Sequence, residues 1–244
     1  MRVFQIKDDW GMDHLQLASR RDPQPGPGQV LLRIKAASLN YRDLVVPNRG
    51  YGSFTGNTAA DSDFRRCRRS RRGRCGGEPG ARRQSGMHCF YQGWLAGAPD
   101  LERLTQTLGG PADGMMADLV CLPESGVVKV PAHLADEQAA TLPWAALTAW
   151  SAVVTYDTLG PGSRVLVQGT GGVALFALQF AKLLGAHVTI ISSSDAKLTR
   201  AQALGADAGI NYLTTPEWAR SERVVVGQPR LTLACGIGDC LRRI

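Results

Sequence analysis

The sequence lacks the marks of several protein classes. Its six cysteines include no pair spaced C-x2-C, so the short ligand spacing of a structural zinc site is missing. No apolar run approaches membrane-spanning length, and charges within Met1–Asp9 occupy the place of a signal peptide's apolar region. No internal repeat is evident. We therefore expect a cytoplasmic protein with free thiols, no membrane partner and no metal site.

Apolar side chains are also absent from one internal segment. Between Phe64 and Met87 the chain has no Val, Ile, Leu or aromatic residue, so this stretch cannot form a buried strand. It carries nine arginines, and with only three acids residues 61–86 hold +6 of the chain's formal net charge of +7. The basic character is therefore a local property of this segment.

A glycine-rich turn lies between a predicted strand and a predicted helix. Residues 165–167 read as a buried strand, and Gly169 permits the tight turn that follows. Gly171 lets backbone approach a pyrophosphate, and Ala174 fills the third small position of the G-x-G-x-x-G/A pattern. An apolar helix is expected over residues 173–184. This succession predicts the start of a dinucleotide-binding βαβ unit.

The end of the next predicted strand, residues 187–191, bears on cofactor choice. Serines 192–194 follow it, with Lys197 and Arg200 in the first turns of the next helix, and hydroxyls and cations suit a 2′-phosphate. An NAD site places an acid near this point, but Asp195 comes late and fits a helix first turn equally well. The pattern favours NADP(H). The alternative for the two cations is an ordinary solvated helix face.

Further motifs carry a family resemblance. They are Asn40-Tyr-Arg-Asp43, Leu142-Pro-Trp-Ala-Ala-Leu-Thr-Ala-Trp150 and Gly205-Ala-Asp-Ala-Gly-Ile-Asn-Tyr212. With the glycine turn, they resemble the medium-chain dehydrogenase/reductase superfamily, and most of all its zinc-independent, quinone oxidoreductase-like alcohol dehydrogenase branch. The resemblance covers about residues 1–60 and 88–218.

That resemblance implies an α/β fold of two domains. Residues 1–134 would form a GroES-like β-barrel catalytic domain, and residues 135–244 a Rossmann-type doubly wound parallel sheet. Short strands are expected at residues 30–36, 116–122 and 126–130. The likeness fades after Trp218, so we expect a C-terminally truncated sheet, although residues 231–235 still read as its fourth strand.

The arginine-rich segment has three interpretations: a solvated loop, a nucleic-acid or anion-binding patch on a Rossmann scaffold, or a frameshifted stretch. The codons of residues 61–77, read one nucleotide later, can encode IPTSDGAGEVV, then E or A, then VGAGV. That string resembles the strand-turn-strand of the family at this place. The family pattern returns at about Met87, so we favour a pair of compensating frameshifts, with turnover impaired or lost.

The resemblance also implies a function and a site. Zinc enzymes of the superfamily carry a catalytic cysteine where this chain has Asn40 and Tyr41, which implies metal-free hydride transfer to a carbonyl, quinone or enone. These two residues, with Tyr51 as a second phenol, are candidates to polarise the acceptor oxygen. An equal alternative for Tyr41 is an aromatic packing under the cofactor. The resemblance also allows a homodimer in intact relatives.

Cofactor contacts are expected from the glycine turn, the following strand ends and the helix over residues 139–154. For Thr148 in that helix, the alternative is a hydroxyl satisfied by its own backbone. The expected contacts are Thr148, Gly169, Thr170, Gly171, Gly172, Val173, Ser193, Lys197, Arg200 and Tyr212.

Overall fold

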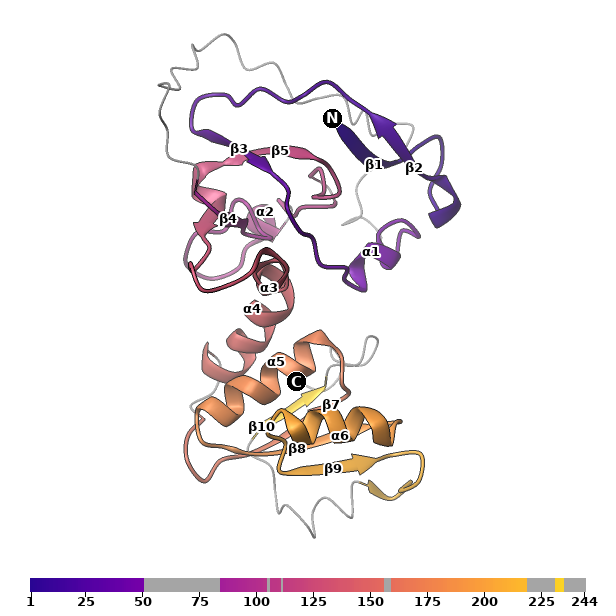
Figure 1. Cartoon of the computed structure of the whole chain (residues 1–244), viewed down its shortest axis with the longest axis vertical. Coiled ribbons are helices and arrows are strands. Elements are labelled where there is room, and N and C mark those ends of the chain that lie inside the picture. The colour runs from indigo at the N-terminus through magenta and orange to yellow at the C-terminus, as the bar shows by residue number, and fades with distance from the viewer. Residues whose placement is uncertain (51–83, 105, 111, 156–158, 219–230, 235–244) are drawn as a thin grey trace. The chain divides into compact units, whose positions relative to one another are not determined.

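The structure of the chain is a computed structural model. It has two compact units, Met1–Pro143 and Trp144–Ile244 (Figure 1). The residues described are 1–50, 84–104, 106–110, 112–155, 159–218 and 231–234. Tyr51 and the arginine-rich stretch up to residue 83 therefore lie outside the described residues. Within the described part, no helix has both the length and the apolar character needed to cross a membrane.

The first unit contains short antiparallel strand pairs. They are β1 (Arg2–Ile6) with β2 (Leu15–Ser19), β3 (Gln29–Arg33) with β5 (Leu119–Pro123), and β4 (Gly86–His88) with β6 (Val127–Lys129). Short helical segments are η1 (Met12–His14), α1 (Arg42–Val45), α2 (Leu101–Leu104), η3 (Glu124–Gly126) and α3 (Asp136–Ala140). The three expected strands are confirmed as β3, β5 and β6. The closed barrel stays a prediction, since the described strands of this unit pair in twos.

A small apolar cluster supports the first unit. Leu108, Val120 and Leu122 are its buried members, and half-buried Leu32 and Val127 are among those that pack against them. Val120 and Leu32 face each other directly in the β3–β5 register. This core therefore depends on a pairing between segments that lie far apart in the sequence.

The second unit is a parallel sheet with the strand order β10-β7-β8-β9. The strands are β7 (Arg164–Gln168), β8 (His187–Ser192), β9 (Ala208–Asn211) and β10 (Leu231–Ala234), and the main helices are α5 (Gly172–Leu183) and α6 (Asp195–Ala203). Numbered along the unit, the strands read 3-2-1-4 from β9, which is the start of the Rossmann order. The expected strands and helices of this unit are confirmed, the fourth strand included. Strand order reverses between β7 and β10, so a ligand crevice is expected at their carboxyl ends.

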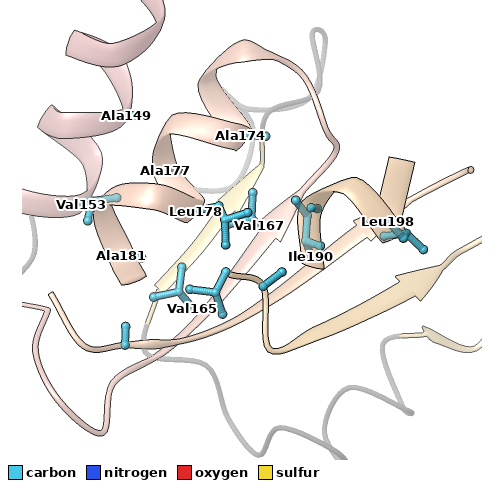
Figure 2. Packing of buried hydrophobic residues seen from close by; sticks show 14 residues of the cluster. Ala149, Val153, Val165, Val167, Ala174, Ala177, Leu178, Ala181, Ile190 and Leu198 are labelled. Carbon is cyan, nitrogen blue, oxygen red and sulfur yellow. The ribbon is translucent and has the colours of Figure 1, made fainter. Parts of the chain in front are cut away.

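Valine and alanine make up most of the core of this unit, together with Leu178, Ile190 and Leu198 (Figure 2). Val165 of β7 lies opposite Val188 of β8, and both are fully buried. The buried face of α5 carries small residues at helical spacing, which lets the helix approach the sheet closely. That face comprises Ala174, Ala177, Leu178 and Ala181, all fully buried.

The helix expected over residues 139–154 is interrupted. After α3, wider π-turns cover Leu142–Ala146 and Ser151–Thr155, on either side of α4 (Leu147–Trp150). The first π-turn contains Pro143, which has no N–H to give to an α-helical bond, so regular helix cannot run through this point.

Candidate functional site: a dinucleotide-binding turn

The glycine turn joins the carboxyl end of β7 to α5. Gly169 has a backbone φ of +91°, a value that residues with a Cβ rarely adopt. Its N–H donates to the Ile191 carbonyl at 2.8 Å. Gly171 is the N-cap of α5, and a Cβ added there would meet no atom within 4 Å. The turn is therefore tied to the end of β8 and leaves open space beside Gly171, as a bound pyrophosphate requires.

The start of α5 supplies hydrogen-bond donors to that space. No side chain caps this helix end, and Leu175 N–H donates to the Gly171 carbonyl at 3.0 Å within the helix. The N–H groups that precede it have no intrahelical acceptor, and the helix dipole adds positive potential at this end. Backbone donors beside an open glycine fit the diphosphate of a dinucleotide.

Neighbouring side chains hold the turn in place. The hydroxyl oxygens of Thr170 and Ser192 lie 3.3 Å apart, and Ser192, the last residue of β8, is only 3% exposed. A Cβ added at Gly172 would lie 3.5 Å from the Ala145 Cβ, so Ala145 occupies the space beside this glycine. Val173 packs against the apolar core. Thr170 is thus engaged with β8, so its first role here is to fix the turn.

The end of β8 presents hydroxyl and cationic groups. Ser193, Lys197 and Arg200 are all exposed, and the two cations lie three residues apart on α6, where neighbouring side chains share a face. Leu198 and Ala201 form the buried face of the same helix. The cations therefore lie on the solvent side of α6, and their exposure also fits the solvated-face alternative.

Asp195 forms a hydrogen bond on the β9 side of β8, opposite to β7. Its Oδ1 accepts a hydrogen bond from Asn211 Nδ2 at 2.9 Å, and Asn211 is the last residue of β9. The carboxylate is therefore held toward β9, whereas the glycine turn extends from β7 on the other side of β8. Sequence reasoning did not identify Asn211. The sequence signal that could have identified it is a polar residue at the carboxyl end of a predicted parallel strand.

Two other predicted contacts have clear local partners. Thr148 is exposed and its hydroxyl donates to the Trp144 carbonyl at 2.8 Å, which is the backbone-satisfied alternative. Tyr212 N–H donates to the Ser192 carbonyl at 3.1 Å, and the Tyr212 side chain is 40% exposed. Tyr212 thus begins the turn after β9 beside the β8 end, with its phenol accessible.

Asn40 and Tyr41 lie together in the first unit, just before α1. Tyr41 is 52% exposed. Asn40 donates through Nδ2 to the Ser38 carbonyl at 3.2 Å, while its N–H donates to Asp43 Oδ2 at 2.7 Å. The phenol is therefore the more accessible of the two donors, because the amide of Asn40 is used within its own segment.

Arg42 anchors this segment. Its Nη2 donates to the Gly110 carbonyl at 3.2 Å, and its guanidinium carbon lies 5.1 Å from the ring centroid of buried Phe90. A planar cation that both stacks and donates fixes α1 against these two neighbours.

The described residues include no group of three or more His, Cys, Asp or Glu side chains that could hold a metal ion. Cys89 and Cys121 are free thiols, and burial raises the pKa of the Cys89 thiol. Burial also lowers the pKa of His88. The remaining cysteines, Cys67, Cys75, Cys235 and Cys240, lie outside the described residues. Among the residues that the structure describes, no donor set fits a zinc ion.

Comparison with known proteins gives the family. A family model described as zinc-binding dehydrogenase matches residues 172–228, so the likeness continues past Trp218. A zinc-type alcohol dehydrogenase-like protein of Schizosaccharomyces pombe is 38% identical over 246 residues, covering 93% of this chain and 64% of that protein. The chain thus spans somewhat less than two thirds of that curated relative's length.

Two solved structures similar to this chain indicate the same family. One, from Sinorhizobium meliloti 1021 and carrying an alcohol dehydrogenase name, is 37% identical with a TM-score of 0.74, over 93% of this chain and 67% of that one. The other, named an NAD-dependent alcohol dehydrogenase, is 31% identical with a TM-score of 0.70, over 93% and 68%. The chain has the fold of a nucleotide-binding dehydrogenase. It belongs to the medium-chain dehydrogenase/reductase superfamily.

Proposed function

We propose that the protein is an NADPH-dependent, zinc-independent oxidoreductase that transfers hydride to the carbonyl, quinone or enone group of a small molecule. The observation that carries this proposal is the glycine turn Gly169–Gly172 at the sheet's switch point, which is open beside Gly171, with the uncapped start of α5 beyond it. When bound, the nicotinamide supplies the hydride. The protein's own residues bind the diphosphate and orient the cofactor.

Cofactor choice rests on the end of β8. Ser193, Lys197 and Arg200 are exposed hydroxyl and cationic groups, whereas the nearest acid, Asp195, is hydrogen-bonded to Asn211. A 2′-phosphate is stabilised by cations and repelled by a carboxylate, so this arrangement supports NADPH. The NAD-dependent relative shows why both cofactors must be compared.

For the acceptor side, we assign the polarising role to Tyr41 before Asn40. The Tyr41 side chain is half exposed, and a phenol can donate its proton to an acceptor oxygen. Tyr51 stays a second candidate from the sequence. Thr148 and Tyr212 remain proposed cofactor contacts. The proposal is weaker for Thr148, because its hydroxyl already donates to the Trp144 carbonyl.

Turnover is proposed to be impaired in this chain, because residues 61–86 replace an expected strand-turn-strand with an arginine-rich stretch. Sequencing the gene tests the frameshift explanation, and the absence of a shifted frame encoding the expected string would remove it. The nucleic-acid alternative gains no support from the relatives. We keep a cytoplasmic location as an expectation, along with a homodimer in intact relatives.

The test is a titration of the purified full-length chain with NADPH and with NADH, followed by nicotinamide fluorescence. We expect saturable binding of both, tighter for NADPH. Equal affinities would remove the NADPH assignment alone. If neither cofactor binds, the oxidoreductase proposal is wrong.

A further inference from the structure

Asn211 is held at both ends of its side-chain amide. Its Nδ2 donates to Asp195 Oδ1 at 2.9 Å, and its Oδ1 accepts from Leu213 N–H at 3.0 Å. Because both heteroatoms have partners, the orientation of this amide is fixed, with the donor facing α6 and the acceptor facing the turn after β9. Asp195 therefore meets a donor that is already oriented toward it.

The sheet register places this pair on one side of β8. Asn211 lies directly opposite Ser192 in the parallel β8–β9 pairing. β7, from which the glycine turn starts, borders the other side of β8. The hydrogen bond with Asn211 thus draws the Asp195 carboxylate toward β9, away from the β7 side on which a dinucleotide bound at the glycine turn would begin.

We propose that Asn211 is a positioning residue that sets cofactor choice by holding Asp195 away from the adenosine ribose. This inference rests on the proposed cofactor site. The first acid after β8 is the group that would repel a 2′-phosphate or accept hydrogen bonds from a ribose 2′-hydroxyl. Asn211 restrains it, which leaves Ser193, Lys197 and Arg200 as the groups presented to a 2′-phosphate.

Fragments of the cofactor test this without turnover. The probes are adenosine 2′,5′-bisphosphate and 5′-AMP, which differ by the 2′-phosphate, each titrated calorimetrically against the full chain. In Asn211→Ala the carboxylate loses its donor, and the bisphosphate should bind about three- to tenfold more weakly, the scale of one hydrogen bond. 5′-AMP should change less than about twofold.

The second variant guards against damage to the turn. Asn211→Asp keeps an acceptor for Leu213 N–H but places two carboxylates together, so Asp195 is pushed away and the bisphosphate should lose at least as much affinity as in Asn211→Ala. The exchange D195N/N211D reverses donor and acceptor while keeping the total charge, and it should restore the preference for the bisphosphate over 5′-AMP.

Thr214→Val is the matched control, because the Thr214 hydroxyl donates to the Asn211 carbonyl at 3.3 Å. It should leave both affinities unchanged.

A double-mutant cycle decides the mechanism. If Asn211 acts through Asp195, Asn211→Ala should have no effect on the affinity ratio in an Asp195→Ala background. A full effect in that background, or an unchanged ratio in Asn211→Ala alone, overturns the inference and leaves the cofactor site standing. A parent chain that binds neither fragment overturns both.

Discussion

The two units are stabilised by contacts of different range. In the second unit, β7, α5, β8 and α6 follow one another within residues 164–203, and their side chains form one core. In the first unit, β3 pairs with β5, so Arg33 lies opposite Leu119, a residue far away in the sequence. Closing a long loop has an entropy cost that the shorter βαβ connections avoid. Residues 61–86 lie between β3 and β5 in the sequence and outside the second unit's core.

This difference predicts that cofactor binding can be removed without disturbing either core. Gly171→Val should abolish nicotinamide binding, because the added side chain fills the open space beside the turn. Its backbone φ of −81° and ψ of −178° suits valine, so the thermal unfolding midpoint should stay close to that of the parent. Fluorescence titration and calorimetry measure the two quantities. Unchanged affinity would mean that the turn is structural only.

The next largest effect compares the cores directly. Leu178→Ala removes a fully buried side chain from the second unit and should cost about 2–5 kcal/mol in its free energy of unfolding. Leu122→Ala, at a position 4% exposed in the first unit, should cost less, because a smaller cluster can collapse more easily around the gap. Hydrogen exchange at increasing urea, read on peptides from each unit, separates the two losses.

If Leu122→Ala unfolds both units together, the two-core description fails. Each loss is expected in the unit that carries the substitution, with exchange in the other unit unchanged.

The same contrast in range explains what could be predicted from the sequence. Gly169, Gly171 and Ala174 follow a strand and open a helix, so a local pattern was enough to place the turn and the sheet around it. The Asp195–Asn211 hydrogen bond was not foreseen, because it needs the β8–β9 register, which no short pattern encodes. The anchoring of Arg42 likewise depends on tertiary contacts, with Gly110 and Phe90.

A charge reversal at Lys197 tests whether the second unit's cations contact the cofactor. Lys197→Glu should weaken NADPH by about 1–3 kcal/mol, the scale of a charge-assisted contact, and should affect NADH much less. Lys7→Glu makes the same charge change at an exposed position of the first unit and serves as the matched control. Parallel titrations of both variants with both cofactors measure the effect. Equal weakening by the two substitutions would indicate a general charge effect and no contact at Lys197.

The smallest expected effect is the pH dependence of an ion pair in the second unit. Lys182 Nζ of α5 lies 2.8 Å from Asp207 Oδ2, which also accepts from Val188 N–H at 2.6 Å. Burial acts to raise the pKa of the Asp207 carboxyl. The hydrogen bonds from Lys182 and Val188, with the nearby positive charges, outweigh it, so the pKa is lowered overall.

A carboxyl whose pKa is lowered by folding stabilises the protein above its unfolded pKa of about 3.9, and that stability disappears as pH falls through the lower folded value. Asp207→Asn should therefore reduce the unfolding free energy at neutral pH and flatten its fall below about pH 4. Asp118→Asn, which breaks the more exposed pair with Arg2 in the first unit, should have the same sign and a smaller size, because solvent screens that pair more. Urea unfolding between neutral and acidic pH measures both. A steeper acid loss in Asp207→Asn than in the parent would contradict the sign of the shift.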